Sequence, residues 1–262
     1  MLKVRVIPTL LIKDLTLVKG ISFNSWRRIG SVLPAIKVYN QRDVDELILV
    51  DISANLSFEE LDYDSINEYG QNCFVPLTVG GGINNFHQAQ NLLRIGADKV
   101  TINTMSFMKP NIISEIAKRH GSQCLVVSID ARPKTNSCGW NCYSNSGTRN
   151  TGKDVVEWAK EVEDRGAGEI LLTSIEKDGT LEGYDLKLME KVANCIKIPV
   201  IASGGAGKYQ DMIDVVCKCG VSAVAAASMF HFTEHTPLGA KLAMEKARIP
   251  VRKPLKLEKK LL

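Results

Sequence analysis

Eight short runs of mainly apolar, often β-branched residues recur along the chain at fairly even intervals. They cover residues 4–11, 47–52, 75–79, 99–103, 124–130, 169–174, 198–203 and 223–228. The segments between them, such as FHQAQNLLRIGA and VVEWAKEVEDRGA, carry apolar residues at the spacing of an amphipathic helix. Near-continuously apolar strands that alternate with helices pair in parallel and are covered on both faces. The pattern therefore predicts an α/β protein with a parallel sheet.

Eight such units in 262 residues match the usual size of a closed (β/α)8 TIM barrel, and an open doubly wound sheet is the alternative. No linker rich in Pro, Gly or Ser divides the chain, so we predict one barrel domain over residues 1–251 and a basic tail over residues 252–262. The two halves resemble each other: VPLTVGGGI around Pro76 matches IPVIASGGAG around Pro199, and GADKVTINT matches GVSAVAAAS. We expect two similar half barrels.

Charge and cysteine content exclude several classes of protein. The tail from Arg252 onward holds five of the 33 basic and one of the 29 acidic residues. The rest of the chain has 28 of each, so its charge does not indicate a nucleic-acid-binding surface. No run reaches the ~18 apolar residues of a membrane span, and the charged N-terminus is unlike a signal peptide. The seven scattered cysteines favour reduced thiols. We expect a cytoplasmic protein.

Two further pairs of residues have a spacing similar to that of metal ligands. Cys138 and Cys142 lie in a long polar loop over residues 132–152 and lack a second pair of ligands nearby. His231 and His235 are four residues apart near the last strand, without a third ligand. We therefore predict no metal and no cofactor.

Glycine-rich turns follow the third and the seventh predicted strands. Glycine lets backbone N–H groups approach a phosphate closely, and the start of the next helix adds a partial positive charge. Such turns also form for geometric reasons without a ligand. Two of them at equivalent positions of a duplicated barrel favour a ligand with a phosphate at each end. The predicted phosphate-binding residues are Gly81, Gly82, Asn103, Thr104, Gly204, Gly205, Ala227 and Ser228.

Candidate acid and base groups lie at the carboxyl ends of strands, where barrel enzymes carry their chemistry. Asp130 ends an apolar strand, where a carboxylate is costly unless it faces a pocket. Asp178, in EKDGT, is equally compatible with a turn. The half-repeat alignment places Leu11, which cannot move a proton, opposite Asp130. The candidates are Asp130, Asp51 and Asp178, with Lys19 in the loop after the first strand and Thr173 as a hydroxyl partner.

Four charged residues near the amino ends of strands alternate in sign around the predicted barrel: Arg5, Glu46, Lys99 and Glu169. Residues at this end of a barrel usually serve stability, so their spacing alone indicates a structural ring.

Ordered matches cover almost the whole chain: IPTLLIKD, VDELILVDI, PLTVGGGI, GADKVTINT, GSQCLVVSIDA, GAGEILLTSIEKDGTLEGYD, IPVIASGGAG and AASMFHF. With these motifs the chain resembles the HisF-like cyclase subunit of imidazole glycerol phosphate synthase. The resemblance implies a (β/α)8 barrel that docks a glutaminase at its bottom and conducts ammonia through its centre. The implied substrate is a phosphoribulosyl aminoimidazole ribonucleotide with two phosphates, and the products are imidazole glycerol phosphate and an aminoimidazole carboxamide ribonucleotide.

The resemblance also implies residue roles. It makes Asp130 a catalytic carboxylate and turns the four-residue charged ring into a gate for ammonia. It also places Asp98 at the glutaminase interface. One segment departs from the family: IPCLD reads IPTLL, with Thr9 and Leu11 where Cys and the second catalytic Asp are expected. Loss of such an acid or base commonly costs about 10² to 10⁴-fold in rate.

The altered segment is similar to a branch of cyclase-like proteins associated with glycosyl amidation, which occur with a second glutaminase and a sugar amidotransferase. We therefore expect a subunit that pairs with a glutaminase and channels ammonia for acetamidino formation on a surface-polysaccharide sugar. One alternative is a genuine cyclase of histidine biosynthesis. Another is a non-catalytic activator of the glutaminase.

Overall fold

Eight parallel strands close into a barrel in the computed structural model, which describes residues 2–53, 61–135 and 137–253. The strands are, in order around the barrel, β1 (Arg5–Lys13), β4 (Leu47–Asp51), β5 (Leu77–Gly80), β6 (Lys99–Ile102), β7 (Leu125–Pro133), β10 (Glu169–Ser174), β11 (Val200–Ser203) and β12 (Ala223–Ala226). The last strand pairs in parallel with the first, with Arg5 opposite Ala223. This closure confirms the predicted (β/α)8 TIM barrel and excludes the open sheet.

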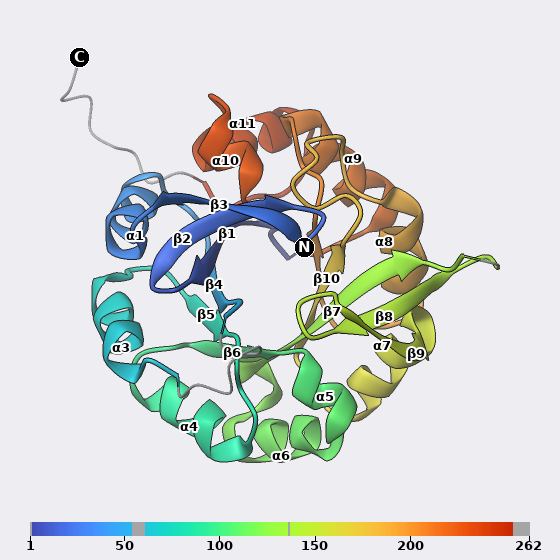
Figure 1. Cartoon of the computed structure of the whole chain (residues 1–262). Coiled ribbons are helices and arrows are strands. Elements are labelled where there is room, and N and C mark those ends of the chain that lie inside the picture. Colours follow the sequence, from blue (N-terminus) through green and yellow to red (C-terminus); the bar gives the residue numbers. More distant parts are fainter. Residues whose placement is uncertain (1, 54–60, 136, 254–262) are drawn as a thin grey trace.

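Helices surround the ring of strands (Figure 1). The longer ones are α1 (Val32–Gln41), α3 (Tyr63–Asn72), α4 (Phe86–Arg94), α6 (Asn111–His120), α7 (Val155–Asp164), α8 (Leu186–Ala193), α9 (Tyr209–Cys219) and α11 (Pro237–Lys246). Shorter elements are α5 (Thr104–Met108), η1 (Ser122–Cys124) and α10 (Ser228–Phe232). Within the described ranges, no helix is both long and apolar enough to span a bilayer.

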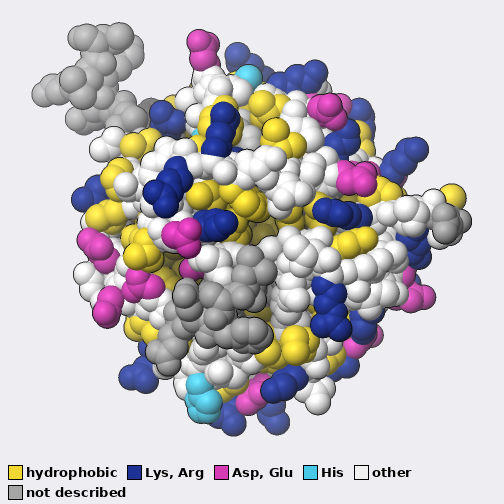
Figure 2. Space-filling model, viewed as in Figure 1, with side chains coloured by type: hydrophobic (Ala, Val, Ile, Leu, Met, Phe, Trp, Pro, Cys, Tyr) yellow, Lys and Arg dark blue, Asp and Glu magenta, His cyan; other side chains and the backbone are white. Residues whose placement is uncertain are grey.

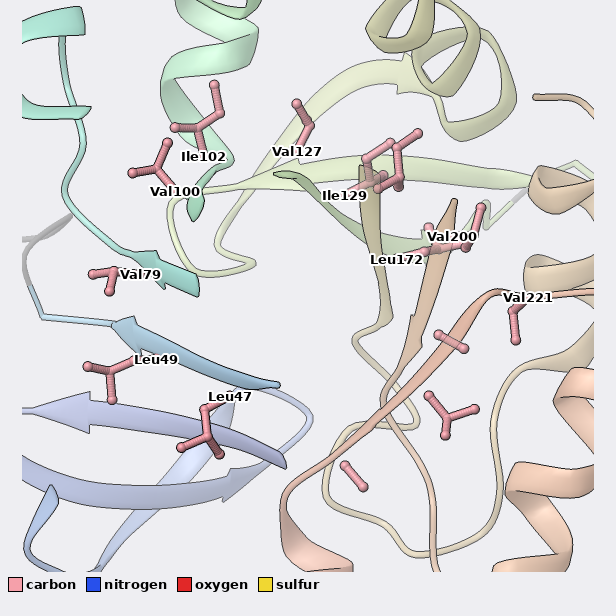
Figure 3. Packing of buried hydrophobic residues seen from close by; sticks show 14 of the residues in the cluster. Leu47, Leu49, Val79, Val100, Ile102, Val127, Ile129, Leu172, Val200 and Val221 are labelled. Carbon is pink, nitrogen blue, oxygen red and sulfur yellow. The ribbon is translucent and has the colours of Figure 1, made fainter. Parts of the chain in front are cut away.

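The strands bury apolar side chains on both faces, as their near-continuous apolar sequences predict. One set, including Leu49, Val100 and Leu172, packs between the strands and the helices (Figure 3). A second set fills the barrel interior and includes Ile7, Ile48, Val126, Leu171 and Ile201. Alternate residues of a strand face opposite sides, so each strand contributes to both layers. The interior is therefore a packed apolar layer that separates the two ends of the barrel.

Two antiparallel hairpins extend the first and fifth barrel strands, and here two expectations were wrong. The segment after β1 forms β2 (Thr16–Ile21) and β3 (Asn24–Gly30), and the predicted loop 132–152 contains β8 (Trp140–Ser144) and most of β9 (Arg149–Asp154). Strands such as RNTGKD are not packed into the core, so their sequences are polar and lack apolar alternation. Such sequences resemble loops. The hairpins occupy equivalent places in the two halves, which extends the resemblance between them.

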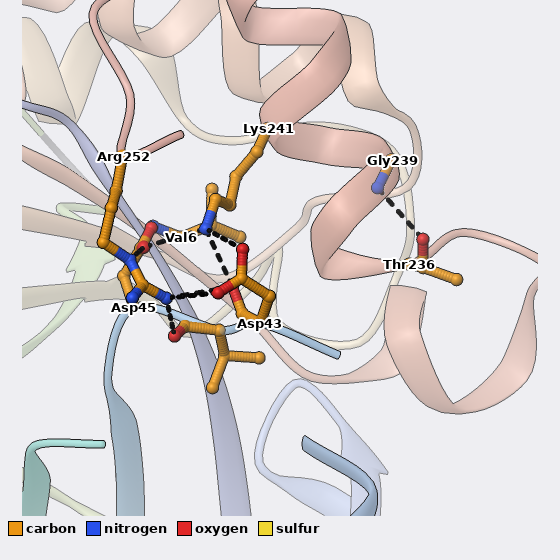
Figure 4. A network of polar contacts seen from close by, with 8 residues as sticks. Val6, Asp43, Asp45, Thr236, Gly239, Lys241 and Arg252 are labelled. Atoms are coloured by element: carbon orange, nitrogen blue, oxygen red, sulfur yellow. Dashed lines mark hydrogen bonds and ion pairs between the residues drawn. The ribbon is translucent and has the colours of Figure 1, made fainter. Parts of the chain in front are cut away.

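A network of ion pairs connects α11 and the segment that follows it to the residues just before β4 (Figure 4). Lys241 of α11 is fully buried and donates to Asp43 and to Asp45. Arg252 donates to the same two carboxylates at 2.8 Å. The first residue of the predicted basic tail is thus tied to the barrel, whereas residues 254–262 lie outside the described residues.

Candidate functional site

The carboxyl ends of the barrel strands surround one large pocket, with about 1140 Å³ of empty space that includes its open mouth. All the acid, base and phosphate-binding residues predicted at this end line it: Lys19, Asp51, Gly81, Gly82, Asn103, Thr104, Asp130, Thr173, Asp178, Gly204, Gly205, Ala227 and Ser228. On the face viewed in Figure 1, side chains of both charge signs lie around a central hollow with hydrophobic side chains (Figure 2).

The glycine turns that line the pocket are required by the backbone itself. Gly81 has a φ of +100° and Gly205 a φ of +112°, conformations that other residues rarely adopt. A Cβ on Gly81 would overlap the backbone oxygen of Asp51, and a Cβ on Gly205 would overlap that of Gly183. The geometry therefore explains these glycines before any ligand is considered, and it also leaves their backbone open to the pocket.

Asp130 is a buried carboxyl group of the pocket, with an exposed fraction of 8%. Its Oδ2 accepts a hydrogen bond from Asn103 Nδ2 at 2.9 Å, and its Oδ1 accepts one from Ser128 Oγ at 3.3 Å. Burial raises the pKa of Asp130 to about 7, the hydrogen bond from Ser128 opposes this shift, and the nearby charge of Asp178 adds to it. A carboxyl group with this pKa exchanges its proton near neutral pH, which suits a general acid or base.

The pocket wall around Leu11, contributed by β1 and β4, is apolar. Leu11 pairs with Val50 of β4, and both side chains line the pocket. Asp51, one residue further along β4, accepts hydrogen bonds from the backbone N–H and the hydroxyl of Ser53 at 2.8 and 2.6 Å. The pocket thus has an apolar side at Leu11 and a polar side at Asp130.

Lys19 and Asp178, predicted as separate acid or base candidates, form an ion pair with each other. Lys19 lies on β2 rather than in a loop, and its Nζ donates to both carboxylate oxygens of Asp178 at 3.0 Å. Thr173 lies on β10 directly beside Asp130 in the sheet register. The structure therefore brings all the acid and base candidates to one pocket and joins two of them directly.

The β2–β3 hairpin lies over this pocket. Phe23 and Trp26 belong to the pocket lining, and a Cβ on Gly147 of the opposite hairpin would come within 2.8 Å of the Phe23 ring. The backbone N–H of Ser22 donates to the Asp178 carbonyl at 2.8 Å. The two hairpins therefore meet above the pocket.

The four charged residues at the amino ends of the strands form a closed ring of ion pairs, the charged ring. Arg5 lies 2.7 Å from Glu46 and 3.1 Å from Glu169. Lys99 lies 3.1 Å from Glu46 and 3.2 Å from Glu169. Thr78 also donates its hydroxyl to Glu46 at 2.8 Å. Beside the ring, the exposed Asp98 accepts a hydrogen bond from the backbone N–H of Leu77.

The model of the family described as "Histidine biosynthesis protein" matches residues 5–236. The chain belongs to the histidine biosynthesis family. Two relatives are named imidazole glycerol phosphate synthase subunit HisF. The one from Caulobacter vibrioides (strain NA1000 / CB15N) is 45% identical over 252 residues, which cover 96% of this chain and 97% of the relative. The one from Bacillus cereus (strain ATCC 10987 / NRS 248) is 44% identical and covers 96% of this chain and all of the relative.

In this member of the histidine biosynthesis family, sequence reasoning missed the partners that hold Asp130. Asn103 was predicted to contact phosphate, yet its amide donates to Asp130 and, at 3.3 Å, to the Tyr143 carbonyl. Ser128 was not predicted at all, although its place two residues before Asp130 on the same strand puts both on one face. No group of three or more His, Cys, Asp or Glu side chains within the described residues is arranged to hold a metal ion.

Proposed function

We propose that the chain is a cyclase-type subunit of an imidazole glycerol phosphate synthase. It receives ammonia from a glutaminase at the charged ring and adds it to a ligand with two phosphates in the pocket. The names of the two relatives support the reaction class. The observation that carries the proposal is a buried carboxyl group that has no cation paired with it among the described residues, Asp130, in the same pocket as two glycine turns of positive φ.

Asp130 supplies the proton chemistry in this proposal. When ammonia adds to the ligand, the nitrogen must lose a proton, and when the ligand is cleaved, its leaving group must gain one. A group with a pKa of about 7 is present in both forms at neutral pH, so Asp130 serves as base in one step and acid in the other. The two glycine turns, with Ser228 next to one of them, hold the phosphates, and the Ser228 hydroxyl is buried without a partner among the described residues.

Ammonia enters at the opposite end. Arg5, Glu46, Lys99 and Glu169 form the gate, which leads through the apolar interior layer to Asp130. A neutral ammonia molecule crosses such a layer more easily than an ammonium ion, because a charge loses its hydration there. The glutaminase docks at this end, next to Asp98.

Leu11 favours a second candidate function. Where the resemblance leads us to expect a second catalytic carboxylate, the pocket has an apolar wall of Leu11 and Val50. In the second function the barrel still receives ammonia from the glutaminase but delivers it to another acceptor. A sugar amidotransferase then uses it to convert an acetamido group of a surface-polysaccharide sugar into an acetamidino group.

The test compares the natural protein with Leu11→Asp, using the aminoimidazole ribonucleotide and an ammonium salt without any glutaminase. Turnover by the natural protein supports the cyclase function. Turnover by Leu11→Asp alone means that the pocket is intact and that ammonia goes to another acceptor. If neither protein turns over while the natural chain still stimulates the glutaminase, the chain is an activator. Leu11→Asn, similar in size but unable to ionise, is the matched control.

A further inference from the structure

Strand β7 leads from the apolar interior of the barrel to the pocket through three side chains on one face. Val126 belongs to the interior apolar layer, Ser128 comes next, and Asp130 lies in the pocket. These residues face the same way because side chains alternate along a strand. Ser128 thus occupies the level between the apolar layer and the acid/base candidate, and it lines the pocket.

The two oxygens of Asp130 are held from two different elements. Ser128 donates from β7 to Oδ1 at 3.3 Å, and Asn103, which follows β6, donates to Oδ2 at 2.9 Å. Asn103 is itself fixed, since its amide also donates to the Tyr143 carbonyl at 3.3 Å. A carboxylate with one donor on each oxygen has a defined orientation.

We propose that Ser128 is a positioning residue for Asp130, which fixes the carboxyl group at the inner end of the pocket and adjusts its proton exchange. This inference rests on the proposed function for its role in turnover, although the contact itself does not. A hydroxyl group suits this place because it donates to an ionised carboxylate and accepts from a protonated one. Ser128 therefore keeps its partner in both states of Asp130.

The charged and titratable groups around Asp130 decide how much Ser128 matters. Asp178, from the loop after β10, raises the pKa of Asp130, and Lys19 of β2 is already paired with Asp178. Cys142 of β8 packs in the core cluster outside the barrel, and burial raises the pKa of its thiol, so it stays neutral. Asn103 is uncharged. The Ser128 hydroxyl is thus a contact that lowers the pKa of Asp130 against its burial and the charge of Asp178.

The experiment is a carbon-13 NMR titration of the aspartate carboxyl groups in the full chain, without ligand, which needs no catalytic activity. Ser128→Ala removes the donor and is expected to raise the pKa of Asp130 by about half a unit to one unit. Ser128→Thr keeps the hydroxyl and is expected to restore the natural value. Asp130→Asn identifies the signal. Ser65→Ala is the matched control, because Ser65 also donates to a carboxylate, that of Asp62 at 2.6 Å, outside the large pocket.

An unchanged Asp130 pKa in Ser128→Ala overturns the proposal. So does an equal shift of the Asp130 pKa in Ser65→Ala. Where the natural protein turns over, the limb of its pH–rate profile that reports Asp130 must move with the NMR value in Ser128→Ala, while KM changes little. A shifted pKa in a chain that shows no turnover would overturn the cyclase function and leave the positioning role supported. The two failures are therefore distinguishable.

Discussion

The ammonium group of Lys19 lies 3.0 Å from both carboxylate oxygens of Asp178, a residue 159 positions away in the chain. Both residues are buried, with exposed fractions of 3% and 8%. The pair joins β2 to the loop after β10, next to a point where Gly20 and Gly179 are so close that a Cβ on Gly179 would overlap the Gly20 carbonyl. The ion pair is therefore the charged part of the contact that holds the β2–β3 hairpin over the pocket.

We expect Lys19→Met to release this hairpin without unfolding the barrel. The substitution leaves the Asp178 carboxylate buried without its cation, which commonly costs about 3 to 5 kcal/mol. Opening the hairpin relieves that cost locally, because the hairpin lies outside the ring of barrel strands. Hydrogen–deuterium exchange should show at least about tenfold faster exchange over residues 16–30, with little change in the barrel strands.

Lys177→Met is the control for this prediction. Lys177 pairs with Glu182 at 3.1 Å, but both side chains are partly exposed, so the pair contributes little. Equal exchange in the β2–β3 hairpin of the two variants would show that the Lys19–Asp178 pair does not hold this hairpin over the pocket.

A second prediction concerns Asp130 and pH. Its pKa is about 7 in the folded chain, against about 3.9 in an unfolded one. Between these values the folded chain binds a proton that the unfolded chain releases, so the contribution of Asp130 to stability falls as pH rises from about 4 to 7. Asp130→Asn does not titrate. Relative to the natural protein, the free energy of unfolding of Asp130→Asn should therefore increase by a few kcal/mol between pH 4 and 8.

Urea unfolding at several pH values measures this difference, and Asp62→Asn gives the opposite sign. The side-chain and backbone hydrogen bonds from Ser65 lower the pKa of Asp62, so its contribution to stability is present at neutral pH and is lost as pH falls through that lowered pKa. A stability gap between Asp130→Asn and the natural protein that is independent of pH would contradict a raised pKa at Asp130.

The barrel and the residues that line its pocket could be predicted from the sequence for one physical reason. Parallel strands in a closed barrel all end on the same side, so residues that follow apolar runs, such as Asp130 and Gly204, must converge there. Contacts that depend on side-chain direction were not predictable. Lys19 and Asp178 are far apart in the chain, and nothing in either segment indicates their pairing. The polar strand Arg149–Asp154 lacks apolar alternation and so resembled a loop.

A third prediction concerns the buried network of Figure 4. Lys241 is fully buried and donates at 2.8 Å to the Asp43 carbonyl and at 3.1 Å to the Asp45 carboxylate. Lys241→Met leaves the partly exposed Arg252 to balance both carboxylates. We expect a loss of about 2 to 4 kcal/mol in the free energy of unfolding, measured with urea. Lys246→Met, on the exposed side of the same helix, should change it by less than about 0.5 kcal/mol. Equal effects would contradict a structural role for the network.

The last prediction tests whether backbone geometry or close approach of a phosphate requires glycine at position 81. Its φ of +100° and the overlap of a Cβ with the Asp51 carbonyl both oppose any side chain, whether or not a phosphate binds. Gly81→Ala should therefore lose about 3 kcal/mol or more of stability in the chain without ligand. Gly152→Ala provides the comparison, because its φ is +74° but no atom lies within 4 Å of its Cβ. It should lose about 1 to 2 kcal/mol, the backbone cost alone. If Gly81→Ala were no less stable than Gly152→Ala, the backbone would not require glycine at Gly81, and close approach of a phosphate would be the better explanation for it.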